Sequence, residues 1–116
     1  DVLQTVHFLL TTAGAAAFLT DIEILATLLA AIAHDMGHDG YTNDYHKATI
    51  SERALDHNNQ SIQENHHATR LFKSMMCDDN INLFAGLDRK QQILLRGLLI
   101  ALILGTDVSR HFEERE

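Results

Sequence analysis

The chain has 116 residues, enough for one small domain or part of a larger one, and 46% of them are hydrophobic, as in ordinary globular proteins. Its formal charge of -7 with neutral histidines argues against a general binder of nucleic acid, because no basic stripe could neutralise the phosphates. With no proline and only 6 glycines, the sequence favours helices with few sharp turns.

Several features of the sequence bear on the location of the protein in the cell. The single cysteine, Cys77, cannot form an internal disulfide, which favours a reducing compartment, and we expect the protein in the cytoplasm. No basic region of a signal peptide precedes the first apolar residues. The apolar stretches 22–33 and 93–104 run for about a dozen residues each, so they predict buried helices and not membrane spans. Because the chain opens on Asp1 instead of Met, we expect a piece of a longer protein.

Two helices are predicted in the first third of the chain. The apolar spacing over 2–19 predicts one helix, in which His7 sits among apolar neighbours and is expected in a core or an interface. Thr20 is a good N-cap for a second helix, since acidic residues follow it near the positive end of the dipole. Isoleucines, leucines and alanines occupy nearly every position of 22–33, so we expect that helix to be buried almost all round.

This apolar helix ends in a dense polar stretch, His34-Asp35-Met36-Gly37-His38-Asp39. Imidazole nitrogens and carboxylate oxygens are metal ligands, and a carboxylate can bridge two ions. The alternative is a polar helix terminus with capping aspartates and surface histidines. Charged groups at the end of a buried helix need a partner, which favours the metal site.

Two further polar clusters lie beside predicted helices. Residues 44–55 carry short helical turns with Ser51 as a cap, and 61–76 predicts a helix that includes Glu64-Asn65-His66-His67. That cluster alone could be ligands, an acid/base set or a solvated face. Asp88 caps the last long helix, which ends at Gly105-Thr106-Asp107. Helix bundles build metal sites from side chains that point inward in this way.

Together the three clusters resemble motifs of the class I cyclic-nucleotide phosphodiesterases, metal-dependent phosphohydrolases of the HD type. Ala33-His34-Asp35-x-x-His38-x-Gly40-x-x-Asn43 is similar to the central signature of that family. Asn58-x-x-Ser61-x-x-Glu64-Asn65-His66-His67 resembles its Asn-Asp-x-Ser-x-Leu-Glu-Asn-His-His motif. Thr106-Asp107-Val108-Ser109-Arg110-His111 resembles its Thr-Asp-Met-x-x-His motif.

The resemblance implies a metal centre. In it His34 ligates a tightly held zinc ion, and Asp35 bridges that ion to a second one, magnesium or manganese. His38, Glu64 and Thr106 would contact the water shell of the metals and serve as catalytic residues.

The resemblance also implies a substrate pocket and a reaction. Asn43, His67 and Asp107 would line or support the pocket beside the metals. The small-molecule partner would be cAMP or cGMP, which a hydroxide activated by two metals converts to the nucleoside 5'-monophosphate.

The fold that the resemblance implies is all-α, a compact helical bundle of the HD type. Residues 1–116 would be the central part of the catalytic domain, truncated at both ends. They would supply two of the family's four protein ligands to the tight metal, so we expect this piece alone to be inactive. The alternatives are a degenerate, non-catalytic regulatory or binding domain and another HD-type phosphohydrolase.

The sequence departs from the family pattern at several positions. Gly37 stands where the family often has Asp, and Asp39 where it often has Pro. Asn59 replaces an Asp, which removes a charge near the helix that carries Glu64. Gln63 replaces an apolar residue. None of these changes affects His34, Asp35 or Glu64.

Overall fold

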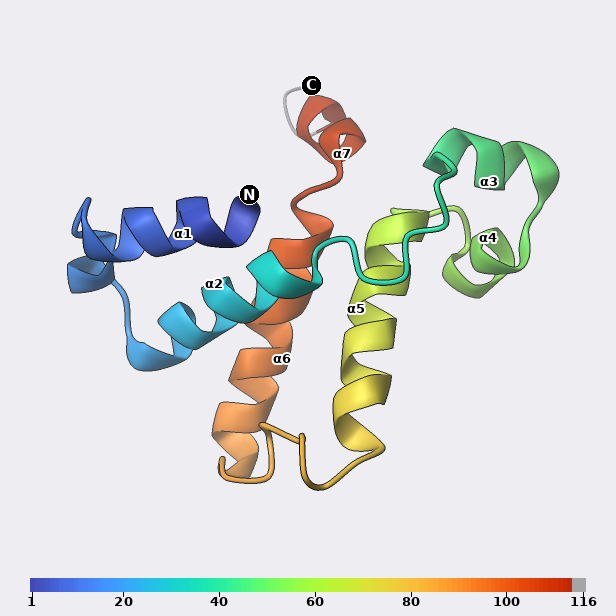
Figure 1. Cartoon of the computed structure of the whole chain (residues 1–116). Coiled ribbons are helices and arrows are strands. Elements are labelled where there is room, and N and C mark those ends of the chain that lie inside the picture. Colours follow the sequence, from blue (N-terminus) through green and yellow to red (C-terminus); the bar gives the residue numbers. More distant parts are fainter. Residues whose placement is uncertain (114–116) are drawn as a thin grey trace.

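A computed structural model describes residues 1–113 of the chain and the side chains of residues 1–110. Every regular element in this part is helical, which confirms the predicted all-α class and the partial bundle (Figure 1). None of these helices has the length and apolar character that crossing a membrane requires. The elements are α1 (Val2–Thr11), the short 3₁₀ helix η1 (Ala15–Phe18), α2 (Asp21–Ala33), α3 (Asn43–Thr49), α4 (Glu52–His57), α5 (Ile62–Met76), α6 (Arg89–Leu104) and α7 (Val108–Glu113).

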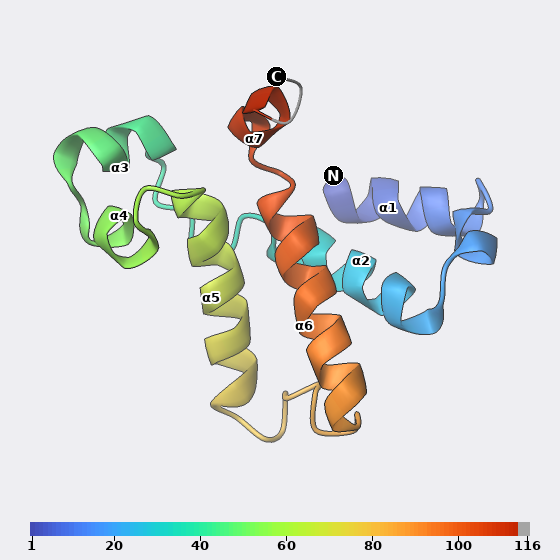
Figure 2. The same cartoon turned by 180° about the vertical axis from the view of Figure 1, so that it is seen from behind.

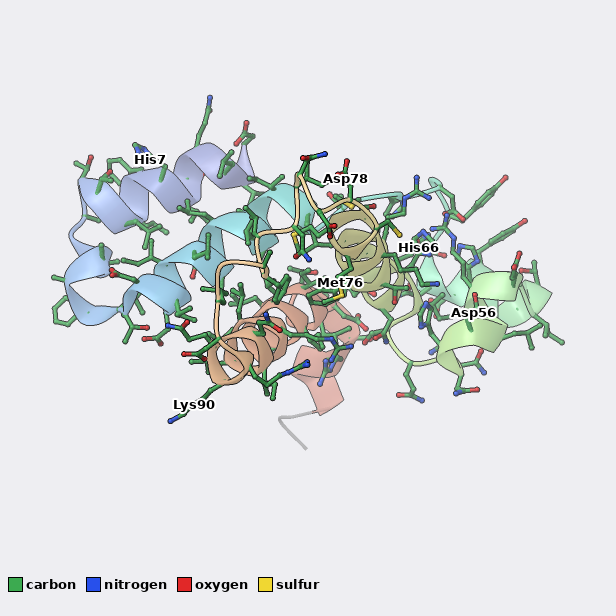
Figure 3. All side chains as sticks on the ribbon, turned by 90° about the horizontal axis from the view of Figure 1, so that it is seen from below. His7, Asp56, His66, Met76, Asp78 and Lys90 are labelled. Atoms are coloured by element: carbon green, nitrogen blue, oxygen red, sulfur yellow. The ribbon has the colours of Figure 1, made fainter. Side chains whose placement is uncertain are left out.

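The prediction of one helix over 2–19 is wrong. The α-helix ends at Thr11, and Gly14 takes the left-handed conformation with φ of 78° before the 3₁₀ turn. Glycine adopts this conformation at little steric cost, and a left-handed residue cannot continue a right-handed helix. His7 is exposed on the outer side of α1, so the expected core position is wrong as well (Figure 3).

Helix α2 begins where the sequence predicts. Thr20 Oγ1 accepts a hydrogen bond from Glu23 N at 3.3 Å, and Thr20 N donates to Glu23 Oε1 at 3.0 Å, a complete capping box. The expectation of burial all round is wrong for the described residues, since Ile32 is 60% exposed. What α2 buries is a stripe of alanines, and these small side chains allow α6 to approach closely: Ala26, Ala30 and Ala33.

The apolar core lies where α2 crosses α6 and where α5 runs beside α6, an arrangement visible from both sides (Figures 1 and 2). Asp88 caps α6 as predicted, accepting from Gln91 N at 2.8 Å. Along α6 the spacing of four residues places Leu95, Leu99 and Ile103 on one face, and all three are 0% exposed. From α5 and the following loop the core receives Ala68, Leu71, Phe72, Met75 and Phe84.

Helices α3 and α4 lie at the first turns of α5, on the side away from α1 (Figure 1). Ser51 caps α4 as predicted by accepting from Ala54 N at 3.2 Å. These two short helices bury only His46 and Ala54, so they have almost no apolar core of their own. Their attachment must rest on polar contacts.

Candidate metal and substrate site

A cavity of about 290 Å³ lies where the end of α2, the loop 37–42, the start of α5 and the end of α6 meet. All of the predicted site residues except Asp107 line it. Segments far apart in the sequence are thereby brought together. The lining consists of His34, Asp35, His38, Tyr41, Thr42, Asn43, Gln63, Glu64, His67 and Thr106.

His34 occupies the C-cap of α2, so the apolar helix fixes its backbone. Its Nδ1 lies 2.8 Å from the carbonyl oxygen of Ala31, which requires the proton on Nδ1, so in the neutral imidazole the lone pair is on Nε2. That Nε2 lies 3.0 Å from Asp35 Oδ2. A nitrogen lone pair facing a carboxylate is repulsive unless a proton or another cation is shared by the two groups.

The residues therefore fit part of a metal centre. His34 Nε2 and the Asp35 carboxylate supply a nitrogen and an oxygen donor from one short segment. Within the part of the chain that the structure describes, no group of three or more His, Cys, Asp or Glu side chains could hold an ion. The pair is thus incomplete as a metal site among the residues whose side chains are described.

Two further histidines of the cavity lining, His38 and His67, are held by main-chain groups. Gly40 N donates to His38 Nδ1 at 2.9 Å, and His67 Nδ1 donates to the carbonyl oxygen of Met36 at 2.6 Å. The rings stack with centroids 5.7 Å apart. Burial lowers the pKa of His67, although the Met36 carbonyl and the Asp35 carboxylate act in the opposite direction. The surroundings of His67 therefore favour its neutral form, in which Nδ1 carries the proton and Nε2 can accept a hydrogen bond.

Glu64 is oriented by Asn43. The Asn43 side-chain Nδ2 donates to Glu64 Oε2 at 3.0 Å, while its Oδ1 accepts from Gln63 N at 2.9 Å. One amide group therefore joins the start of α3 to the start of α5. The remaining acceptor positions of the Glu64 carboxylate are available to the cavity.

Thr106 and Asp107 follow α6 but have different surroundings. Thr106 Oγ1 donates to the carbonyl oxygen of Ile103 at 2.7 Å, and the residue lines the cavity. Asp107 is 7% exposed and lies outside that lining: its carboxylate accepts from Ser61 Oγ at 2.7 Å and from Ser109 Oγ at 2.7 Å. Burial would raise the pKa of Asp107, but hydrogen bonds from Ser61 and Ser109 and the charge of Arg110 lower it overall.

The Asp107 carboxylate also supports the entry into α5. Ser61, the N-cap of that helix, has φ of 39° and ψ of 60°, a conformation that few residues with a side chain adopt. Asn59 is left-handed too, with φ of 63°, which asparagine tolerates well. Helix α5 is formed with the uncharged Asn59 near its start, and the Ser61–Asp107 hydrogen bond ties that start to the segment that follows α6.

Gly37, one of the departures from the family pattern, lies against His66, a residue that matches the pattern. Gly37 has φ of +74°, and a Cβ placed there would lie 3.1 Å from His66 Nε2. That Nε2 atom is buried and has no hydrogen-bond partner in the described residues. Burial, followed by the nearby charges of Arg53 and other basic groups, lowers the pKa of His66. An acidic side chain at position 37, which the resemblance leads one to expect, would face this imidazole.

Sequence reasoning missed three lining residues: Tyr41, Thr42 and Gln63, the last of which it noted only as a departure from the family pattern. Thr42 caps α3 by accepting from Tyr45 N at 3.1 Å, and its position before Asn43-Asp44 is a signal that could have identified it. Tyr41 has no such signal in the sequence. His111, the last residue of the third motif, lies outside the described side chains.

Comparison with known proteins shows the family of the chain. A sequence model described as 3'5'-cyclic nucleotide phosphodiesterase matches residues 1–116. The chain belongs to this family. Among the relatives of this phosphodiesterase chain is the dual specificity calcium/calmodulin-dependent 3',5'-cyclic nucleotide phosphodiesterase 1 of Drosophila melanogaster, 44% identical over 114 residues. The 1B protein of Bos taurus is also 44% identical over 114 residues.

Solved phosphodiesterase domains share the fold. The crystal structure of the phosphodiesterase domain of the RhoPDE fusion protein from Salpingoeca rosetta superimposes with a TM-score of 0.87 at 40% identity. It covers 97% of this chain, and the chain covers 35% of that domain. The alignments take in 98% of this chain but only 14% of the Drosophila relative and 21% of the bovine one. The chain is therefore similar to a limited part of each.

Proposed function

We propose that the protein containing this chain hydrolyses 3',5'-cyclic nucleotides, cAMP or cGMP, to nucleoside 5'-monophosphates. The observation that carries the proposal is the convergence of residues from three separate motifs on one cavity. Membership of the phosphodiesterase family supports the same activity. The single free cysteine, Cys77, is exposed and is compatible with the cytoplasmic location that we also propose.

The proposed roles follow from the atoms that each side chain leaves available. His34 Nε2 and the Asp35 carboxylate would hold the metals, zinc at the tight site and magnesium or manganese at the second. When bound, such ions neutralise charge on a phosphate and lower the pKa of water. His38 and Glu64 would hydrogen-bond and orient water in the cavity, and Thr106 would add its hydroxyl lone pairs.

The cavity dimensions restrict what this chain can bind. A volume of about 290 Å³ is at the small end of ligand sites, on the order of 300 to 1,000 Å³. We therefore propose that the described residues take the cyclic phosphate, with Asn43 and His67 supporting the wall beside it. Asp107 would support the site indirectly, by accepting a hydrogen bond from Ser61 at the start of α5.

The test is hydrolysis of cAMP and cGMP by the full protein that carries this chain, with magnesium or manganese and again after chelation. We expect Asp35→Ala to lower turnover by more than about 100-fold, because it removes the oxygen donor beside His34. The matched control is Asp21→Ala, an exposed aspartate at the other end of α2, which should leave turnover unchanged.

The outcomes separate the alternatives. Near-wild-type turnover in Asp35→Ala would refute the metal role of that carboxylate. Binding of cyclic nucleotide without any hydrolysis by a folded wild-type protein would favour the degenerate binding domain.

A further inference from the structure

Two departures from the family pattern, Asp39 and Gln63, contact each other in the structure. Gln63 Nε2 donates to Asp39 Oδ1 at 2.6 Å, although the residues are 24 positions apart. Gln63 is 3% exposed, so its amide lies in the interior, where an unsatisfied polar group would be costly. The two unusual residues therefore satisfy each other.

Arg53 and His46 complete a group that we call the polar cluster: Asp39, His46, Arg53 and Gln63. Arg53 Nη1 donates to Gln63 Oε1 at 2.8 Å, and its Nε lies 3.6 Å from Asp39 Oδ2. His46 Nε2 lies 2.9 Å from the same Asp39 oxygen, and its Nδ1 lies 2.6 Å from Ser51 Oγ. Gln63 Nε2 also donates to the carbonyl oxygen of Tyr41 at 2.8 Å, so both of its amide hydrogens are used.

The polar cluster joins four segments at one wall of the cavity. Its members come from the loop 37–42, from α3, from α4 and from α5. Three of these segments, the loop, α3 and α5, carry the cavity residues Tyr41, Thr42, Asn43 and Glu64. Since α3 and α4 each bury a single side chain, the hydrogen bonds of the cluster, together with those of Asn43, contribute to holding this wall against α5.

The pKa of Asp39 agrees with a polar cluster whose hydrogen bonds are already formed. Burial would raise the pKa of Asp39, but hydrogen bonds from Tyr41 N, Gln63 and His46 and the charge of Arg53 lower it far below its usual range. The carboxylate is therefore ionised throughout the physiological pH range. Its charge is balanced by Arg53, which is only partly exposed.

We propose that the polar cluster, with Gln63 at its centre, consists of positioning residues that hold the loop 37–42 and Asn43 in register with Glu64 for hydrolysis. The inference rests on the proposed function, because Glu64 is the group whose orientation is set. The path runs from Gln63 Nε2 to the carbonyl oxygen of Tyr41, two residues before Asn43, and from Asn43 Nδ2 to Glu64 Oε2. The bond from Gln63 N to Asn43 Oδ1 is a separate main-chain link to α5. Gln63 lines the cavity, whereas Asp39, His46 and Arg53 do not and would act through Gln63 and Tyr41.

The decisive variant is Gln63→Met in the full protein, because methionine keeps the length of the side chain and removes its hydrogen bonds. We expect kcat for cyclic-nucleotide hydrolysis to fall by about 10- to 100-fold with a much smaller change in KM, since a misplaced catalytic group affects the reacting geometry more than binding. A crystal structure of the variant should show Asn43 Nδ2 beyond hydrogen-bond distance of Glu64 Oε2.

The matched control is Gln92→Met. Gln92 Nε2 also donates to two carbonyl oxygens, those of Phe84 at 2.9 Å and Leu87 at 3.0 Å, but it lies on α6 and lines no part of the cavity. We expect this variant to lower the melting temperature while kcat stays unchanged. The pair of variants therefore separates positioning from general stability.

Substitutions at Asp39 test whether keeping the acceptor for Gln63 preserves kcat. Asp39→Asn retains an oxygen that can accept from Gln63, so its kcat should stay closer to wild type than that of Asp39→Ala. The double variant Asp39→Ala/Gln63→Met should have nearly the kcat of its worse single variant, because both changes break one link.

The outcomes distinguish a failure of the positioning inference from a failure of the proposed function. If the wild-type protein is active and Gln63→Met has the kcat of Gln92→Met, the positioning inference is overturned while the proposed function stands. If the folded, metal-supplied wild-type protein hydrolyses neither nucleotide, the proposed function fails and the inference fails with it.

Discussion

The two halves of this chain are held together by different forces. The half made of α2, α6 and most of α5 is apolar, with leucine, isoleucine and alanine side chains buried between the helices. The half made of the loop 37–42, α3, α4 and the first turn of α5 is joined by side-chain hydrogen bonds that centre on Gln63. The candidate site lies where the two halves meet.

This difference assigns different tasks to the two halves. Close packing leaves an apolar core few alternative arrangements, so α2 presents His34 and Asp35 from a fixed helix end. The polar half depends on directional hydrogen bonds, and losing one partner leaves others unsatisfied. We expect the apolar half to determine whether the domain folds, and the polar half to determine how precisely the site is arranged.

The largest effect on stability should come from the apolar half. Leu99 of α6 is 0% exposed in the core that this helix forms with α2 and α5. Leu99→Ala therefore removes packed atoms and leaves a cavity. We expect the free energy of unfolding to fall by about 2 to 5 kcal/mol. Chemical denaturation of the full protein measures this loss.

The control on the same helix is Lys90→Ala, a change at an exposed position near the start of α6 (Figure 3). Its effect on stability should be close to zero. A loss in Leu99→Ala no greater than that in Lys90→Ala would contradict the division between the two halves. A core variant that stays folded should also keep the metal-dependent turnover that a site variant loses.

A smaller effect is expected at the start of α2, which supports the apolar half locally. Thr20→Ala removes the acceptor for Glu23 N and breaks the capping box. We expect a loss of about 1 kcal/mol in the free energy of unfolding, as for other N-cap threonines. Thr20→Ser keeps the hydroxyl and serves as the control. Equal losses in the two variants would show that the cap hydrogen bond is unimportant.

The elements that the sequence predicts well are those with a local chemical signal. Thr20, Ser51 and Asp88 each have an oxygen followed by helix-forming residues, and all three cap a helix in the structure. The family and the all-α class could be predicted because three motifs occur in order, even though none of them is decisive alone.

What the sequence could not predict depends on contacts between distant residues. Gln63 and Asp39 are only departures from a pattern until the fold places them 2.6 Å apart. The burial of α2 was overestimated because apolar composition does not say which face meets a neighbour, and only the alanine stripe does. Asp107 adjoins Thr106 in sequence, yet its carboxylate points to Ser61 and not into the cavity lining.

The smallest expected effect is a pH dependence concentrated in α4 and the first two turns of α5. Burial lowers the pKa of His57, His66 and His67, and the described core cluster contains no titratable group. A histidine with a lowered pKa in the folded state costs nothing above the unfolded value of about 6.5, and it destabilises the fold as the pH falls below that value. Asp39 and Asp107 also have lowered pKa values, so their contribution is lost only at a much lower pH.

Hydrogen exchange in the full protein can measure this difference segment by segment. Between about pH 7.5 and pH 5.5, once intrinsic exchange rates are corrected, amides at the start of α5 should lose protection while those of α6 should not. His66 is the sharpest probe, because its buried Nε2 has no partner in the described residues. In His66→Leu the loss of protection on acidification should be smaller. An unchanged loss would mean that His66 does not titrate with folding, and equal losses in α5 and α6 would mean that the two halves respond to acid as one unit.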